Sequence, residues 1–298
     1  MKFEAKHSVR RHLDLLAVLF LMAGMTTLVG CTRNTEKAVA ATQTSFNTPE
    51  EAGQALRAAS KAHDEDTLTT ILGSNSKAIL SSGDPVEDKE SLDVFVSQYD
   101  HMNRWVTMTD GSQVLYIGAT NYPFPIPLAK NASSKWQFDT KAGENEILTR
   151  RIGGNELLAI DACYAMARAE KRYFKDTNQY TLKIISTPGK QDGLYWPVPS
   201  DQPASPLGRV EEFAKASVDA AYAGAPAVFD GYVFGILPSK KDGFTVVASP
   251  VKYGDSGIMS FILGPDGVVQ QKDLGAGTSL LAVSTDSSNR EQGWTPAE

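Results

Sequence analysis

The chain has 298 residues and a formal net charge of −6 at pH 7, and 42% of its residues are hydrophobic. This length is enough for one large domain or two ordinary ones, with a sizeable core. Acidic and basic residues are mixed without a long block of one sign, and no basic stripe of the kind that binds nucleic acid is present. We therefore expect a folded protein with no nucleic-acid partner.

The first thirty residues differ from the rest of the chain. Four lysine and arginine residues open the chain, and a predominantly apolar stretch at 13–29 follows them. This arrangement predicts a signal peptide over 1–30. An uncleaved membrane anchor is the alternative, but the apolar stretch is short for a spanning helix, which needs about 20 apolar residues.

The expected signal peptide ends in Leu28-Val29-Gly30-Cys31, which resembles the lipobox of bacterial lipoproteins. By that resemblance, cleavage would fall before Cys31, its sulfur would receive a diacylglyceryl group, and its new amine would be acylated. Several acyl chains, at about 0.8 kcal/mol per buried methylene, make such an anchor effectively permanent. Thr32 stands where an Asp is the usual inner-membrane retention signal. The resemblance therefore implies a lipoprotein of the outer membrane that faces the periplasm.

A tether at 31–47, rich in Thr, Ala and Ser, leads to the first expected domain, 46–142. Its first helix opens with a capping box, in which Thr48 is the N-cap, Pro49 begins the helix and Glu51 completes the box. After the helices the hydrophobic period changes from 3.6 to 2 residues, which predicts antiparallel strands. The helices are expected from Pro49, at Asp66–Leu72 and at 88–102, and the strands at 104–109, 113–118, 123–129 and 135–140.

The order of these elements, from a Thr-Pro-Glu-Glu helix to a Lys-Trp-Gln-Phe-Asp strand, resembles the cystatin-like or nuclear-transport-factor-like cone fold. The resemblance implies a pocket inside the concave face of the sheet. Many members of these folds bind small molecules, and others are structural. The prolines of 123–129 place that strand at an edge of the sheet.

The second expected domain, 143–298, opens with the longest helical pattern of the chain. Gly153-Gly154 is a point at which the helix could divide, with Asn155 as a new N-cap. Apolar residues at helical spacing form a stripe along this helix, and Glu170 and its charged neighbours lie largely off that stripe. Cys163 on the stripe is interpreted as a small buried hydrophobe rather than a reactive thiol. It is the only cysteine beyond the lipobox, so neither an internal disulfide nor a zinc site of Cys and His is expected. The stripe consists of Leu157, Ile160, Cys163, Tyr164, Ala167 and Phe174.

A turn-dense crossover at 187–208 follows, and a short helix is expected at Val210–Ala221. The chain then forms an antiparallel meander, so that both domains belong to the α+β class. One face of the meander is expected to pack on the 155–174 helix, with Val246, Ile258, Phe261 and Val268 in the core or at its rim. The expected strands are 231–237, 244–250, 258–263 and 268–274.

A long helix, a crossover and an antiparallel meander, over 164–180 and 231–274, resemble the globular part of type IV pilins and pseudopilins. A pilin begins with a hydrophobic fibre-forming helix, and here a whole domain and a lipobox stand in its place, so a fibre subunit is not expected. Some pilin-like domains hold calcium near the end of this helix, which makes Asp176, Asn178 and Asp192 weak candidates for metal ligands. A plain helix-terminating turn is the favoured interpretation, and no metal or other cofactor is expected.

Four stretches within 90–275 carry a further resemblance. They read "WQFDTKAGENEILTRRIGGNEL", "STPGKQDGLYWP", "SPLG" and "YGDSGIMSFILGPDGVVQQKDLG". Together they resemble a family of uncharacterised bacterial proteins catalogued as domain of unknown function 2950. The resemblance covers most of the chain and implies no known activity.

Gly-Asp-Ser-Gly at 254–257 matches the tetrapeptide around the nucleophilic serine of chymotrypsin-like proteases. Such an enzyme needs a general base and an orienting acid beside its serine. The histidines beyond the leader, His63 and His101, lack the Ala-Ala-His-Cys setting of these proteases. We therefore interpret the stretch as a tight turn between strands, in which Ser256 bonds to its own backbone.

Two further groups of residues have both a functional and a structural interpretation. Tyr195 and Trp196, next to a proline, could form a binding surface, but they more often seal the edge of a core. A group of four charged residues could perform acid–base chemistry, but a solvated helix face with an i,i+4 pair is the favoured interpretation. This group consists of Glu144, Glu146, Arg150 and Arg151.

The sequence as a whole predicts a lipid-anchored envelope protein with a non-enzymatic binding or structural role. Its partners would be the membrane, reached through the lipid, and an envelope protein or a cell-wall component. A small-molecule carrier that uses a pocket in 46–142, and an envelope hydrolase that uses unassigned carboxylates, are the alternatives. A pocket in 46–142 lined by converging polar side chains would favour the carrier or the hydrolase. A filled apolar interior would favour the binding or structural role.

The lipid anchor can be tested at its single attachment site. Replacing the lipidated thiol, Cys31→Ala, should leave an unprocessed precursor that takes up no labelled palmitate, because both acylation and cleavage depend on that residue. The measurement is metabolic labelling followed by gel analysis of the precursor and mature forms. Normal labelling and processing of the variant would show that Cys31 is not the anchor.

Overall fold

The computed structural model describes residues 43–199, 201, 203–208, 226–239, 243–279, 283 and 293–297. The expected signal peptide, Cys31 and the short helix expected at Val210–Ala221 lie outside these residues. The chain divides into two compact units, Met1–Arg151 and Ile152–Glu298. The boundary between Arg151 and Ile152 falls within helix α6, Thr140–Thr177. The units carry separate antiparallel sheets and several helices, which confirms the α+β class.

The helices of the first unit begin where their capping residues predict. Thr48 Oγ1 accepts a hydrogen bond from the Glu51 N–H at 3.2 Å, and Glu51 Oε2 accepts one from the Asn47 N–H at 2.9 Å. This reciprocal pair is the expected capping box. Asp64 and Asp84 cap the next two long helices in the same way. The helices are α2 (Pro49–Ala62), α3 (Glu65–Leu72), η2 (Ser74–Ser76), α4 (Lys77–Leu80) and α5 (Pro85–His101).

The sheet of the first unit has the order β1-β2-β4-β5, with β3 paired to β2. The strand expected at the edge is instead split: β3 ends at Pro123, and β4 lies between β2 and β5. The edge prediction is confirmed for β3, which pairs with β2 alone among the described strands, and is wrong for β4, because the remaining prolines precede β4 and none has to donate to its ladder. The strands are β1 (Asn103–Thr107), β2 (Gln113–Ile117), β3 (Tyr122–Pro123), β4 (Leu128–Lys130) and β5 (Trp136–Phe138).

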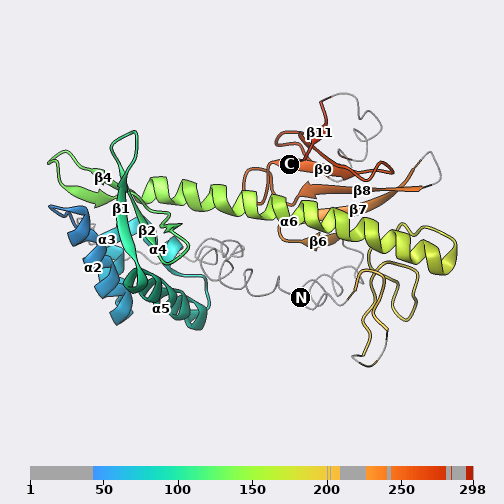
Figure 1. The fold of residues 1–298 in the computed structure, drawn as a ribbon, viewed down its shortest axis with the longest axis horizontal. Helices are drawn as coiled ribbons and strands as arrows, with labels where there is room; N and C mark the ends of the chain where they lie inside the picture. Colours follow the sequence, from blue (N-terminus) through green and yellow to red (C-terminus); the bar gives the residue numbers. More distant parts are fainter. Residues whose placement is uncertain are drawn as a thin grey trace, which may run out of the picture. The chain divides into compact units, whose positions relative to one another are not determined.

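Helices α2, α3 and α5 pack on this sheet and fill its interior (Figure 1). Phe124 contacts Phe95 at a ring-centroid distance of 5.4 Å and Phe138 at 6.3 Å, so aromatic rings pack together in the core of this unit. The fully buried core positions include Ala52, Leu68, Leu115, Ile117, Ile126 and Leu128.

Helix α6 runs without interruption through Gly153 and Gly154, so the division expected there does not occur. Glycine lowers helix propensity by about 1 kcal/mol but removes no backbone donor, so packing elsewhere on the helix can offset it. Asn155 does not cap a new helix. Its side-chain amide donates to the Ser256 carbonyl at 2.8 Å and so joins α6 to the sheet of the second unit.

The second unit packs α6 against a sheet of order β11-β10-β9-β8-β7-β6 (Figure 1). Ala159, Cys163 and Met166 of α6 are at most 2% exposed in this core. Burial raises the pKa of the Cys163 thiol to about 12, in keeping with the structural interpretation of this residue. The strands are β6 (Ala227–Phe229), β7 (Tyr232–Ser239), β8 (Gly243–Pro250), β9 (Met259–Leu263), β10 (Val269–Asp273) and β11 (Thr295–Pro296).

The central strand β8 is buried on both faces, which the sequence analysis did not anticipate. Val246 faces the α6 core, and its neighbour Val247 belongs to a second cluster on the opposite face, together with Trp294. Val268 was expected in the core but is 43% exposed, because β10 begins one residue later with the fully buried Val269. In the parts of the chain that the structure describes, no helix has the length and apolar character needed to cross a membrane.

The α6 core gives a stability prediction. Phe261 is fully buried, so Phe261→Ala should lower the free energy of unfolding by about 3–5 kcal/mol. Val268→Ala, an apolar truncation one strand away at an exposed position, should change it by about 0.5 kcal/mol or less. Denaturant unfolding followed by circular dichroism measures both, and equal losses would contradict this packing.

Candidate functional site

The end of α6 and the loop that follows it form an irregular region of the second unit that many hydrogen bonds stabilise. Asn178 ends the helix in the left-handed conformation, with φ of 57°, and its N–H donates to the Phe174 carbonyl at 2.7 Å. This is the helix-terminating turn that the sequence favoured over a calcium site. Asp176 and Asn178 are exposed there.

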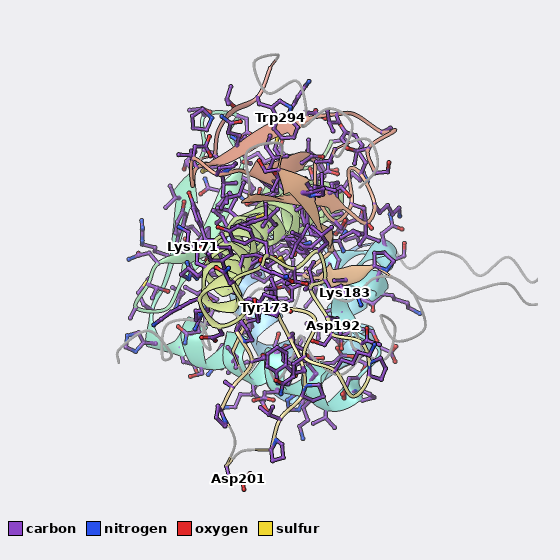
Figure 2. The ribbon with its side chains drawn as sticks, turned by 90° about the vertical axis from the view of Figure 1, so that its right-hand side faces the viewer. Lys171, Tyr173, Lys183, Asp192, Asp201 and Trp294 are labelled. Atoms are coloured by element: carbon purple, nitrogen blue, oxygen red, sulfur yellow. The ribbon has the colours of Figure 1, made fainter. Side chains whose placement is uncertain are left out.

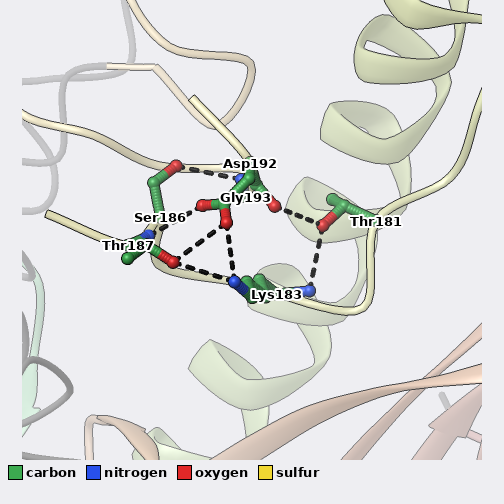
Figure 3. Close-up of polar contacts among 6 residues, drawn as sticks. All are labelled: Thr181, Lys183, Ser186, Thr187, Asp192 and Gly193. Atoms are coloured by element: carbon green, nitrogen blue, oxygen red, sulfur yellow. Dashed lines mark hydrogen bonds and ion pairs between the residues drawn. The ribbon is translucent and has the colours of Figure 1, made fainter. Parts of the chain in front are cut away.

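The loop, residues 181–195, is held together by the carboxylate of Asp192 (Figure 3). Asp192 accepts hydrogen bonds from Lys183 Nζ at 2.6 Å, the Thr187 N–H at 2.8 Å and Thr187 Oγ1 at 2.9 Å. The Lys183 ammonium and these donors hold the pKa of Asp192 well below its usual range. Asp192 therefore acts as an ionised structural crosslink, and its carboxylate already has partners other than a metal ion. No cluster of three or more His, Cys, Asp or Glu suited to a metal occurs among the residues that the structure describes.

Backbone pairing brings the two arms of the loop together. Tyr195 exchanges hydrogen bonds with the Ile184 carbonyl and the Ser186 N–H, both at 2.8 Å. Gly193 permits this approach, because a Cβ there would lie 2.8 Å from the Ser186 nitrogen. Tyr195 is only 7% exposed and Trp196 is partly buried. Tyr195 is therefore buried and offers little surface to a partner.

An exposed apolar surface lies at the end of α6, formed by Phe174, Tyr180 and Leu182. We call these three residues the aromatic surface; they are 37%, 36% and 54% exposed. The rings of Phe174 and Tyr180 stack with centroids 4.5 Å apart, and Tyr180 also contacts Phe244 at 5.3 Å. The sequence analysis placed Phe174 on the buried stripe and did not single out Tyr180 or Leu182. Tyr180 and Leu182 are large apolar residues in an otherwise polar turn, and this is the sequence signal that could have identified the surface.

Three exposed lysine residues lie in the same stretch of the chain. Lys171 and Lys175 are on the last turns of α6, and Lys183 is on the loop that follows. Figure 2 labels Lys171 and Lys183. Cations at a helix C-terminus favourably oppose the helix dipole, so part of this charge stabilises α6.

Glu170 is a buried carboxyl group that the sequence analysis placed off the apolar stripe. Its side chain is 0% exposed. Burial raises its pKa from 4.5 to about 7, and the hydrogen bond that its Oε2 accepts from the Thr181 N–H at 3.3 Å opposes this shift. Its other oxygen, Oε1, has no hydrogen-bond partner among the described residues. Because Glu170 follows Cys163 and Ala167 at helical spacing, the sequence did contain the signal that it lies on the buried face.

A cleft of about 400 Å³ lies in the first unit, at the rim of the sheet rather than inside it. Several polar groups that line it are already bonded within the protein. Gln43 Nε2 donates to the Phe138 carbonyl at 2.8 Å, and Asp139 Oδ1 accepts from the Ala142 N–H at 2.9 Å. Thr140 Oγ1 donates to the Leu72 carbonyl. The cleft also exposes Ser74, Asn75, Lys130 and Lys141.

The charged group at the start of α6 forms structural pairs. Arg150 Nε donates to Glu146 Oε1 at 2.8 Å, which confirms the expected i,i+4 pair. Arg150 Nη1 also donates to the Pro123 carbonyl at 2.8 Å, and its guanidinium lies 5.2 Å from the centroid of the Tyr122 ring. Glu144 pairs with Lys141 at 3.1 Å. Arg150 is therefore a packing residue on the first sheet as well as part of a helix pair.

The Gly-Asp-Ser-Gly stretch forms a turn closed by its own side chain and backbone. Ser256 Oγ accepts from the Lys252 N–H at 3.0 Å and donates to the Lys252 carbonyl at 3.2 Å. Glu156 Oε1 fixes the following strand by accepting from the N–H groups of Ile258 and Met259 at 2.9 and 3.0 Å. The turn interpretation is confirmed, although Ser256 is partly buried rather than exposed.

The two histidines do not provide a base within the same unit as this serine. Both His63 and His101 belong to the first unit, whereas Ser256 belongs to the second. His63 Nε2 pairs with Asp93 at 2.8 Å. The hydroxyl of Ser256 is engaged with backbone groups, so its bonding accounts for the residue without a catalytic role.

Residues 43–297 match the family model described as "Protein of unknown function (DUF2950)". The chain belongs to this family. The match spans both compact units, so the family is defined by the two units together rather than by either one. No curated protein and no solved structure matches the chain.

The turn predicts a larger cost for replacing Gly257 than for replacing Ser256. A Cβ at Gly257 would overlap the hydroxyl of Tyr232, a fully buried ring, so Gly257→Ala should destabilise the protein by about 1–3 kcal/mol. Ser256→Ala removes hydroxyl hydrogen bonds and should cost about 1 kcal/mol or less. Denaturant unfolding measures the two variants. A serine-reactive fluorophosphonate should leave the wild type unlabelled, and stoichiometric labelling at Ser256 would show that this turn is an active site.

Proposed function

We propose that this protein is a lipid-anchored protein of the cell envelope with a non-enzymatic binding or structural role, and that the aromatic surface contacts its partner. The lipobox-like sequence ending in Cys31 supports the anchor. The observation that carries the binding role is the exposed stack of Phe174 and Tyr180 beside Leu182. Aromatic residues are enriched at the centres of protein interfaces, where they bury large areas with few rotatable bonds.

The rigidity of the supporting loop favours binding at this surface. Asp192 crosslinks the loop through Lys183 and Thr187, and Tyr195 anchors it by backbone pairing and burial. A preorganised surface loses less conformational entropy on binding than a mobile one. The crosslinked loop therefore provides a preorganised support for a binding surface.

The charge around the aromatic surface favours an anionic partner. The segment 168–190 contains six Lys or Arg and two acidic residues in a chain whose net charge is −6. One of these acids, Glu170, is buried, and Asp192 pairs with Lys183, so the other basic residues leave the segment with a net positive charge. An envelope protein with an acidic patch, or an anionic cell-wall polymer, has the complementary charge.

A small-molecule carrier is the second candidate, and the cleft at the rim of the first sheet is the observation that favours it. The filled aromatic interior of that sheet and the internal bonds of Gln43, Asp139 and Thr140 make it the weaker candidate. Native mass spectrometry of the purified protein distinguishes the two, because a carrier retains a small molecule and a surface-binding protein does not.

The binding role can be tested by removing the aromatic stack. The double variant Phe174→Ala/Tyr180→Ala should reduce partner capture from envelope extracts by about tenfold or more, as loss of interface hot spots does. The matched control is Met108→Ala, which removes a 41% exposed apolar side chain from the first unit. Quantitative mass spectrometry of crosslinked, captured material measures the difference. Equal capture by the double variant and the wild type would reject the aromatic surface as the contact.

A further inference from the structure

The unpaired oxygen of Glu170 requires a physical explanation. In folded proteins the great majority of buried polar groups have a hydrogen-bond partner, and an isolated buried charge is strongly unfavourable. Glu170 is fully buried, accepts one long hydrogen bond through Oε2, and leaves Oε1 without a partner in the described part of the chain. This environment suits a protonated, neutral carboxyl group far better than a carboxylate.

Among the residues that the structure describes, no neighbouring charge compensates an ionised Glu170. Burial and the Thr181 amide are the causes of its shifted pKa, and no lysine or arginine contributes to it. Lys183 and Asp192 pair with each other at 2.6 Å, and Lys171 is exposed. The hydrophobic core that α6 shares with the sheet includes one titratable sheet side chain, the phenol of Tyr232. The titratable side chains on the elements around Glu170 are Cys163, Tyr164, Arg168, Lys171, Arg172, Tyr173, Lys175 and Asp176 on the nearby turns of α6, Tyr180 on the segment that follows, Lys183, Lys190, Asp192 and Tyr195 on the loop, and Tyr232 on β7.

The group that Glu170 contacts lies in a short connection between two rigid parts. We call residues 178–182 the bridge segment, which joins the end of α6 to the crosslinked loop. Its contacts with α6 include the Thr181 N–H to Glu170 and the stack of Tyr180 on Phe174. On the loop side, Thr181 Oγ1 donates to the Asp192 carbonyl at 2.8 Å. The bridge segment can therefore separate from α6 without breaking the crosslinks of the loop.

We propose that the protonation state of Glu170 controls how the bridge segment packs on α6, and thereby regulates the aromatic surface. The protonated group stays buried beneath Thr181 and holds Tyr180 against Phe174. The ionised group needs water or additional donors, and it obtains them when the bridge segment moves away from α6. The claim that this movement regulates binding of a partner rests on the proposed function. The claim that the bridge segment moves does not depend on it.

The direction of the effect follows from the raised pKa. The packed state binds the proton more tightly than an exposed glutamate, whose pKa is 4.5. Packing is therefore fully favoured below about pH 4.5, and it weakens as the pH rises to about 7. Within that window each pH unit lowers the ratio of packed to separated states about tenfold, because one proton is released on separation.

Hydrogen exchange of the lipidated full chain in detergent micelles tests this proposal. Protection factors for peptides covering 178–186, corrected for the pH dependence of intrinsic exchange, should fall about tenfold per pH unit between about pH 5 and pH 7. Peptides from the core strand β8 serve as the internal reference. Glu170→Gln, which cannot ionise, should show no such fall, whereas Asp176→Asn, at an exposed carboxyl group on the same helix, should behave as the wild type does.

Either of two results would overturn the proposal. One is a wild-type protection factor for 178–186 that does not change with pH relative to β8, and this result decides the matter even if Glu170→Gln fails to fold. The other is a folded Glu170→Gln variant that keeps the wild-type fall. Because the measurement contains no partner, a flat profile leaves the proposed binding role standing. Failure of partner capture with a steep profile would reject the binding role and leave the pH-dependent packing in place.

Discussion

The close approach of α6 to the second sheet is the packing interaction on which that unit depends. Most of the helix side chains buried in this core are small, with Met166 the large exception, and they pack against large side chains of the sheet. The apolar area buried in this way stabilises the unit by roughly 25 cal/mol per Å². The residues that meet include Ala159, Cys163, Met166, Ala167 and Ala169 on α6, and Tyr232, Phe234, Val246 and Phe261 on the sheet.

This packing also determines where the molecule can present a binding surface. Ala169 is the last fully buried apolar side chain on the helix, and one turn further along, Phe174 is partly exposed. The aromatic pair thus marks the point where the core ends and a crosslinked loop begins. A partner that covers Phe174 and Tyr180 would extend the core of the second unit rather than occupy a separate pocket.

Local signals predicted much of the fold, and non-local contacts account for the errors. The capping box at Thr48 and the hairpin strands β1 and β2 depend largely on neighbouring residues, and both are where the sequence places them. The stripe on α6 was assigned from helical spacing, and the contact with the sheet decides which residues are buried: Leu157, which was assigned to the stripe, is 61% exposed, whereas Ala159, which was not, is buried. The position of β4 between two strands could not be predicted, because strand order depends on long-range pairing.

The identity of residue 170 is the least expected feature of the candidate site, and it bears on the proposed regulation. A leucine there would continue the apolar stripe and would hold the bridge segment against α6 at every pH. A glutamate in the same place leaves one oxygen unpaired and weakens the packing as the pH approaches about 7. Stability therefore does not explain the glutamate, since an apolar side chain of similar size would serve better. A role that requires the bridge segment to separate from α6 does explain the glutamate. Such a separation moves Tyr180 and Leu182, which are two of the three residues of the aromatic surface.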